Sequence, residues 1–141
     1  MINDGKAKLM LAVCVLGIVS MLSGCGLGFS HNEHLIGPYR LIAVDTSEQM
    51  TVVYDLGDGG FVGRIPQTVF SVGWNDNYIV AKQHPNNNRS FTNYYFLEIA
   101  KDSAHAGPKE SVTGPLTQEQ FAVKQAELQL PPFTRTIKSL E

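Results

Sequence analysis

Hydrophobic and polar residues alternate in short segments along most of the chain from residue 38 onward. β-branched and aromatic residues are frequent in these segments, and a period of two places neighbouring side chains on opposite faces of a strand. The stretches between them, TSEQ, GDGG, NDN and HPNNNRS, are rich in turn-forming residues. The pattern therefore predicts antiparallel strands at Tyr39–Asp45, Met50–Leu56, Thr68–Trp74, Asn77–Gln83 and Asn93–Ala100.

The C-terminal part of the chain predicts one helix. Thr117 and Gln120 match a capping box, and the pair Pro131 and Pro132 cannot continue a helix. Hydrophobic residues between these signals are expected to form a stripe that faces the sheet, namely Phe121, Ala122, Val123, Ala126 and Leu128. Residues 133–140 alternate again and predict a final strand.

Two segments do not fit the alternating pattern. Pro66 has no amide hydrogen for a sheet ladder, which favours an edge or a break between Phe61 and Thr68. Residues 101–115 are rich in Gly, Pro, Ser and Ala and predict a loop. We therefore expect one α+β domain over residues 38–141, an antiparallel meander of five or six strands with one C-terminal helix.

The first part of the chain has a different pattern. Lys6 and Lys8 precede the uncharged apolar segment Leu9–Leu22, an order that is typical of a secretory signal. Because lysines beside such a segment stay in the cytoplasm, we expect the rest of the chain to be exported. Residues 1–24 are assigned to this signal segment, and residues 25–37 to a flexible tether of glycine and polar residues.

Leu22, Ser23, Gly24 and Cys25 resemble the lipobox of bacterial lipoproteins. The resemblance implies recognition of the first three residues by a signal peptidase and cleavage before Cys25. It also implies a thioether-linked diacylglycerol on the Cys25 sulfur, often with a further acyl chain such as palmitate on the new amino terminus. Two or three chains anchor a protein firmly, because each buried methylene contributes about 0.8 kcal/mol.

Two alternatives to this processing stay open. The segment Leu9–Ser30 carries no charge and has the length of a membrane span, although its glycines and serines disfavour a helix. Cleavage elsewhere would release the chain and leave Cys25 as a free exported thiol. The residue after Cys25 is Gly26 rather than the aspartate that usually retains lipoproteins in the inner membrane. The expected location is therefore the outer membrane in a bacterium that has one, and the cell membrane otherwise.

Composition narrows the possible chemistry. Cys14 and Cys25 are the only cysteines, so residues 38–141 contain neither a disulfide nor a cysteine-ligated metal. The formal net charge is −2 and basic residues are scattered singly, which argues against nucleic acid as a partner.

The body of the chain is similar to a group of small bacterial lipoproteins without an assigned activity. The similarity lies in LIAVD, DLGDGGFVGRIP, VGWNDNYIVAKQHP, the tyrosine-rich strand that follows, and the C-terminal LTQEQF. It implies a lipoprotein and transfers no catalytic residue.

Motifs that carry chemistry are scarce. The sequence contains no G-x-S-x-G elbow, P-loop, G-x-G-x-x-G or H-E-x-x-H. His31 and His34 have a spacing found among metal ligands but lack a third partner nearby, and Asp55 and Asp58 fit a hairpin turn better than a calcium loop. We therefore expect no metal and no cofactor.

Three functional hypotheses follow, of which the third is a structural subunit of an envelope complex. In the first, Trp74, Tyr78 and Tyr94 join Arg89 in a recognition surface for an envelope protein, a peptide or a glycan, although most of these aromatic residues could instead fill the core. In the second, the protein is a small hydrolase that uses His84 as a base together with Asp76 or Asp58. We favour the first, a membrane-anchored, non-catalytic binding module of the cell envelope.

Overall fold

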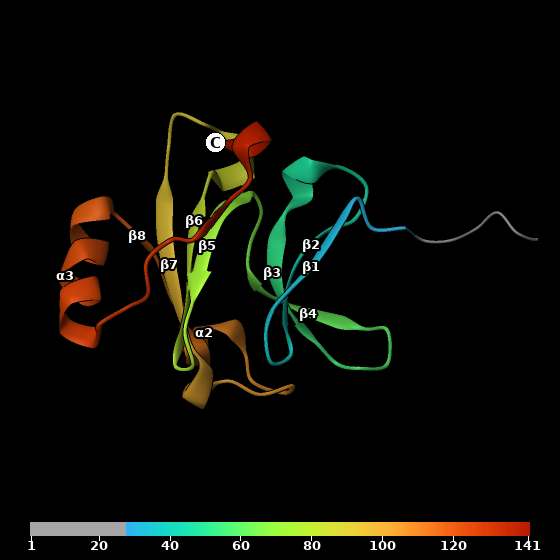
Figure 1. The fold of residues 1–141 in the computed structure, drawn as a ribbon, viewed down its shortest axis with the longest axis horizontal. Helices are drawn as coiled ribbons and strands as arrows, with labels where there is room; N and C mark the ends of the chain where they lie inside the picture. Colours follow the sequence, from blue (N-terminus) through green and yellow to red (C-terminus); the bar gives the residue numbers. More distant parts are fainter. Residues whose placement is uncertain (1–27) are drawn as a thin grey trace, which may run out of the picture.

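The computed structural model describes residues 28–141, so the predicted signal segment, its recognition residues Leu22–Gly24 and Cys25 lie outside the described residues. The described chain forms three layers, which Figure 1 shows from right to left: a four-stranded sheet, a five-stranded sheet and a helix. The predicted α+β class, antiparallel pairing and single main helix near the C-terminus are confirmed. The described strands number nine and divide between two sheets.

The first sheet has the order β1-β2-β3-β4, and every neighbouring pair is antiparallel. Its strands are β1 (His31–Ile36), β2 (Tyr39–Ala43), β3 (Thr51–Asp55) and β4 (Phe61–Ile65), with η1 (Ser47–Gln49) between β2 and β3. The predicted hairpin turn at DLGDGG is confirmed. Asp55 and Asp58 there accept hydrogen bonds from the amides of Gly57 and Gly60, at 2.8 and 2.9 Å.

The second sheet has the order β8-β7-β6-β5-β9 and is also antiparallel. Its strands are β5 (Val69–Trp74), β6 (Tyr78–Gln83), β7 (Asn93–Glu98), β8 (Val112–Leu116) and β9 (Arg135–Thr136). The helical segments of this half are η2 (Pro85–Asn87), η3 (Ile99–Lys101), α2 (Pro108–Ser111), α3 (Gln118–Leu128) and η4 (Lys138–Leu140). No helix in residues 28–141 is long and apolar enough to cross a membrane.

The main hydrophobic core lies between the two sheets. Alternate residues of the facing strands fill it, among them Leu41 and Val52 from the first sheet and Val72, Ile79 and Leu97 from the second. All five are almost fully buried, and burial of one such side chain contributes about 1.5–3 kcal/mol. The sheets therefore hold together chiefly through this shared apolar layer.

A second, smaller core lies between α3 and the outer face of the second sheet. Phe121 of the helix packs there with Val80, Tyr94 and Phe96 of the sheet. The capping box is confirmed, since Thr117 Oγ1 accepts from the Gln120 amide at 3.2 Å and Gln120 Oε1 accepts from the Thr117 amide at 2.9 Å.

The predicted apolar stripe of α3 is only partly buried. Phe121 is buried and Leu128 is half-buried, whereas Ala122, Val123 and Ala126 are exposed. The more buried side of the helix follows the spacing 121, 124, 125 and 128, which includes a half-buried lysine and a half-buried glutamine. Helix geometry therefore excludes Val123 from the stripe.

Three segments differ from the sequence prediction. Part of the expected tether, 31–36, is strand β1, whose polar residues suit an edge strand with one solvated face. The break expected at Pro66 is confirmed, because β4 ends at Ile65 and β5 begins at Val69, whereas the expected loop 101–115 contains α2 and most of β8. The final strand is only Arg135–Thr136, because the chain then turns into η4. Whether such segments form strands depends on the strands with which they pair. A short edge strand shows little alternation of hydrophobic and polar residues in its own sequence.

Two strand glycines give a test of the packing. A side chain at Gly73 of β5 would collide with the carbonyl oxygen of Pro132, whereas one at Gly63 of β4 would meet nothing within 4 Å. We expect Gly73→Ala to destabilise the domain by about 1–3 kcal/mol, because overpacking forces the backbone to move. Gly63→Ala is the matched control and should change stability by less than about 0.5 kcal/mol. Urea unfolding measures both, and equal effects would contradict the close approach of residues 131–133 to β5.

Candidate functional site

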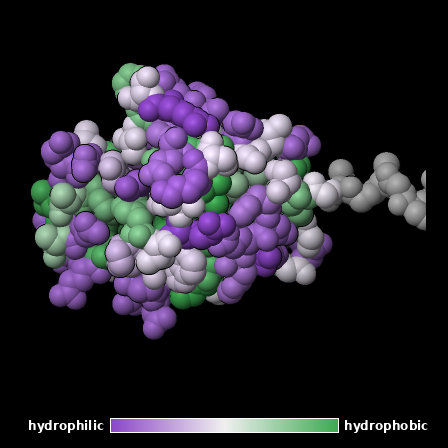
Figure 2. Space-filling model, turned by 45° about the horizontal axis from the view of Figure 1, so that its top comes forward, coloured by the Kyte–Doolittle hydropathy of each residue, from purple (hydrophilic) through white to green (hydrophobic). Residues whose placement is uncertain are grey.

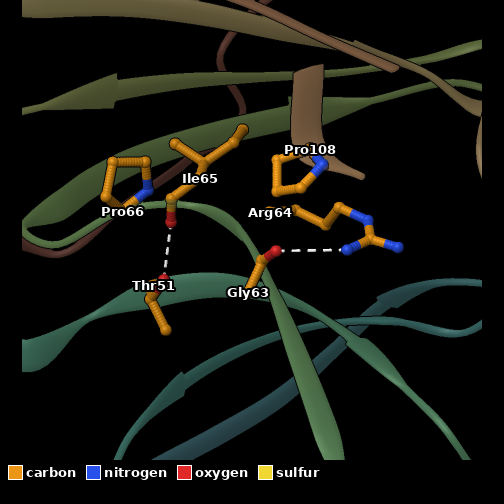
Figure 3. Close-up of a pocket in the computed structure, with 6 residues that line it drawn as sticks. All are labelled: Thr51, Gly63, Arg64, Ile65, Pro66 and Pro108. Atoms are coloured by element: carbon orange, nitrogen blue, oxygen red, sulfur yellow. Dashed lines mark hydrogen bonds between the residues drawn. The ribbon is translucent and has the colours of Figure 1, made fainter. Parts of the chain in front are cut away.

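An open apolar groove runs between β4 of the first sheet and the α2–β8 segment of the second. It consists of two hollows of about 270 and 230 Å³ that share Arg64, Pro66 and Pro108. Thr51, Gly63 and Ile65 complete the first hollow, and Figure 3 shows the rings of Pro66 and Pro108 on either side of Ile65. The second hollow adds Tyr95, Lys109, Val112 and Gly114. Both flanking strands, β4 and β8, are edges of their sheets.

The charged end of Arg64 is buried behind this groove. Its Nε donates to Asp102 Oδ2 at 2.8 Å, and neither side chain is exposed to solvent. Its Nη2 donates to the carbonyl oxygen of Ser103 at 2.8 Å, and the hydroxyl of Tyr39 donates to the same Asp102 oxygen at 2.8 Å. Because Tyr39 and Arg64 belong to the first sheet and Asp102 follows η3, this buried cluster joins the first sheet to the chain beyond β7.

The Tyr39 hydroxyl keeps its proton in this cluster. Burial, together with the hydrogen bond to the Asp102 carboxylate, raises the pKa of Tyr39 well above its usual range. The phenol therefore stays a donor to Asp102. The Arg64 guanidinium also lies 5.4 Å from the centre of the Tyr54 ring. The electron-rich face of an aromatic ring attracts a positive charge at this distance.

The groove has the chemistry of a binding site. Thr51 Oγ1 donates to the carbonyl oxygen of Ile65 at 2.6 Å, and the Arg64 charge is neutralised by Asp102. The lining is mostly apolar and includes Pro66 and Pro108, with Lys109 as a charged lining residue. Such a surface can accept an apolar side chain, and it presents no paired acid and base.

His84 lies outside the groove and is buried. Its Nδ1 is 2.8 Å from the carbonyl oxygen of Phe91, so Nδ1 carries a proton, and its ring stacks on Phe70 with a centroid distance of 4.1 Å. Asp76 lies in the turn before β6 and His84 directly after that strand, while Asp58 lies in the β3–β4 turn. Within residues 28–141, His84 Nε2 has no hydrogen-bond partner, so the hydrolase pair is not assembled.

The residues proposed as a recognition surface are dispersed. Trp74 packs against the core between the sheets, whereas Tyr78 and the buried Tyr94 lie in the core beneath α3, on the other face of the second sheet. Arg89 is exposed in the β6–β7 loop and donates to the carbonyl oxygens of Ser139 and Glu141. These four residues therefore do not share one surface.

The histidines near the start of the domain have local partners. His31 Nε2 lies 3.1 Å from Glu33 Oε2, and His34 Nε2 lies 2.9 Å from the carbonyl oxygen of Gly37. In the part of the chain that the structure describes, no three His, Cys, Asp or Glu residues gather as metal ligands.

The groove was missed from the sequence because the two prolines that flank it come from segments that fitted no pattern. Pro66 was interpreted as a break, and Pro108 belonged to the expected loop. The sequence contained one indication of the groove, because prolines within a sheet are found mainly at its edges. Which two edges face one another is a property of the tertiary structure.

Comparison with known sequences places this domain in a family. The model of the family described as "Protein of unknown function (DUF3997)" matches residues 36–136. The chain belongs to this family. The matched DUF3997 region extends from the last residue of β1 to the last residue of β9 and contains both walls of the groove. The comparisons with curated proteins and with solved structures found no match.

The buried ion pair of this DUF3997 domain can be tested by removing one or both charges. Asp102→Asn leaves the Arg64 cation buried without its counter-charge, and we expect a loss of about 3–5 kcal/mol in the free energy of unfolding. The double variant Arg64→Met with Asp102→Leu removes both charges and should lose less than Asp102→Asn alone. Urea unfolding at neutral pH compares them. A double variant that loses at least as much as the single one would contradict a charge-pairing role.

Proposed function

We propose that this protein is a lipid-anchored protein of the bacterial cell envelope whose DUF3997 domain binds a partner without catalysing a reaction. The observation that carries the anchor is Cys25 within Leu-Ser-Gly-Cys, directly after the uncharged segment Leu9–Leu22. A thiol followed and preceded by glycine suits acylation, because the thiolate is a strong nucleophile and small neighbours leave it accessible.

The position of the folded domain supports this anchor. Strand β1 begins at His31, six residues after Cys25. An extended chain spans at most about 3.6 Å per residue, so this connection reaches no more than about 22 Å. A lipid on Cys25 would hold the domain beside the bilayer, where a partner is met within the envelope. Gly26 favours the outer membrane in a bacterium that has two membranes.

Binding is supported over catalysis by the groove and by the environment of the titratable groups. The Arg64 charge is paired with Asp102, and His84 Nδ1 is bonded to a carbonyl oxygen. The groove instead offers apolar hollows between two edge strands. Edge strands leave main-chain groups free for an added peptide, and hollows beside them accept its side chains. We therefore propose an extended, apolar segment of an envelope protein as the partner.

The two cysteines provide a matched test of the anchor. Cys25→Ser removes the proposed acylation site, whereas Cys14→Ser alters the other cysteine and leaves the lipobox intact. We expect the parent chain and Cys14→Ser to incorporate labelled palmitate, to sediment with membranes and to have the mass of a chain beginning at an acylated Cys25. Cys25→Ser should lose the label and the processed mass. Unchanged processing and labelling of Cys25→Ser would refute the anchor.

The groove is tested with a short peptide that carries one leucine. In nitrogen-15 NMR spectra of the processed protein in micelles, the peptide should shift the amide signals of the lining residues Ile65 and Gly114 in a saturable way. Gly63→Leu should abolish these shifts, because its side chain has free space and would fill the groove. Thr113→Leu is the control, since neighbouring residues on β8 point to opposite faces and Val112 and Gly114 line the groove. Equal binding by all three proteins would exclude the groove as the site.

A further inference from the structure

We infer that the end of the domain at which the described chain begins is a membrane-docking face. It is formed by Phe29, Val44, Leu56 and Phe61, and it rests on the headgroup region of the bilayer that holds the lipid on Cys25. This inference rests on the proposed anchor and adds to it a fixed orientation of the domain.

Exposed hydrophobic residues are concentrated at this end. Residues 28–141 have five large hydrophobic side chains that are clearly exposed, and three of them are Phe29, Val44 and Leu56, at 38%, 46% and 40%. The other two are Phe91 in the β6–β7 loop and Val123 on α3. Single exposed apolar residues are ordinary, but a group of them marks an interaction surface.

Direct contacts connect the members of this face. The ring of Phe29 meets the ring of Phe61 edge-on, with their centres 5.4 Å apart. The amide of Ser30, next to Phe29, donates to the carbonyl oxygen of Val44 at 2.9 Å. The amide of Leu56 donates to the carbonyl oxygen of Gly60, directly before Phe61, at 3.0 Å. The three separate segments that carry these side chains therefore lie next to one another.

The figures place this face at one end of the molecule. In Figure 1 the start of the described chain and the β3–β4 hairpin lie at the right, and α3 lies at the opposite end. Figure 2 shows hydrophobic atoms beside the point where the described chain begins, on a side of the molecule that is largely hydrophilic.

The bilayer is the occupant that the chain length favours. Phe29 is four residues from Cys25, which allows at most about 14 Å between them. The headgroup layer on each side of the hydrocarbon core is about 5–8 Å thick. An acylated Cys25 would therefore keep Phe29 within reach of the membrane interface, where aromatic and aliphatic side chains are favoured.

The acidic residues at this end determine which lipid headgroups the face can approach. Asp45 follows Val44, and Asp55 and Asp58 stand on either side of Leu56 in the hairpin. Carboxylates are repelled by an anionic surface, so the face suits zwitterionic headgroups and a shallow contact. We expect closer contact with phosphatidylcholine vesicles than with vesicles rich in phosphatidylglycerol.

Two exposed valines allow a matched experiment. In the Cys14→Ser background, Val44→Cys and Leu56→Cys report from the docking face, and Val123→Cys reports from α3, where Val123 is 57% exposed. Each processed, acylated protein carries an environment-sensitive fluorophore on the new thiol. It is inserted into phosphatidylcholine vesicles that contain headgroup-level nitroxide lipid. We expect quenching at positions 44 and 56 to exceed quenching at position 123 at least about threefold. Equal quenching at all three positions, or none at 44 and 56, would overturn the docking face.

A second set of variants tests whether the quenching depends on the apolar side chains of the face and not on the fluorophore itself. With the fluorophore at position 44, Leu56→Ser should reduce quenching, whereas Val123→Ser should leave it unchanged. Self-quenching at position 44 that rises with surface density, without nitroxide lipid, would instead assign the face to a second copy of the chain and overturn membrane docking.

Failure of the anchor and failure of the docking face are distinguishable. A mass without acyl groups on Cys25 overturns both proposals, because the protein then has no lipid to hold this end at the membrane. An acylated protein that binds vesicles without the quenching difference retains the anchor and overturns only the docking face.

Discussion

The buried ion pair between Arg64 and Asp102 is the directional contact on which the arrangement of the two sheets at the groove depends. The apolar layer between the sheets contributes most of the stabilisation, but hydrophobic contact has little directional preference. The guanidinium of Arg64 instead requires a carboxylate and a carbonyl oxygen at defined positions, 2.8 Å from Nε and Nη2. Tyr39 donates a second hydrogen bond to the same carboxylate. These contacts set β4 against the segment after η3, and they place Pro66 opposite Pro108.

A second, weaker ion pair connects the two sheets on the side opposite the groove. Arg135 of β9 donates to Glu33 of β1 at 3.0 Å, and the Arg135 side chain is 43% exposed. Exposed pairs contribute little because water and salt screen them. The buried ion pair therefore connects the sheets on the groove side, and the exposed one connects them on the opposite side. The buried pair also explains why the groove is apolar, since its one buried cation is directed away from the groove and neutralised.

The polar groups of this domain act mainly in its structure. His84 donates to the Phe91 carbonyl oxygen and stacks on Phe70, and Arg89 holds the carbonyl oxygens of the C-terminal turn. In Figure 1, α2, whose Pro108 lines the groove, lies at the bottom, between the end where the described chain begins and the end occupied by α3. With the first of these ends on a bilayer, the groove would face sideways. A peptide could then enter it parallel to the membrane.

The sequence by itself determined the elements whose signals are local. Alternation predicted five strands that are present in the two sheets, the Thr117–Gln120 capping box predicted where α3 begins, and Asp-Gly chemistry predicted the β3–β4 hairpin. Only the tertiary structure decided that the strands divide into two sheets, that 31–36 and 112–116 form edge strands, and that Arg64 meets Asp102. The physical reason is that these features depend on partners far apart in the chain: 38 residues separate Arg64 from Asp102. A period of two specifies which residues share a face, but it does not specify which strand or charge lies opposite.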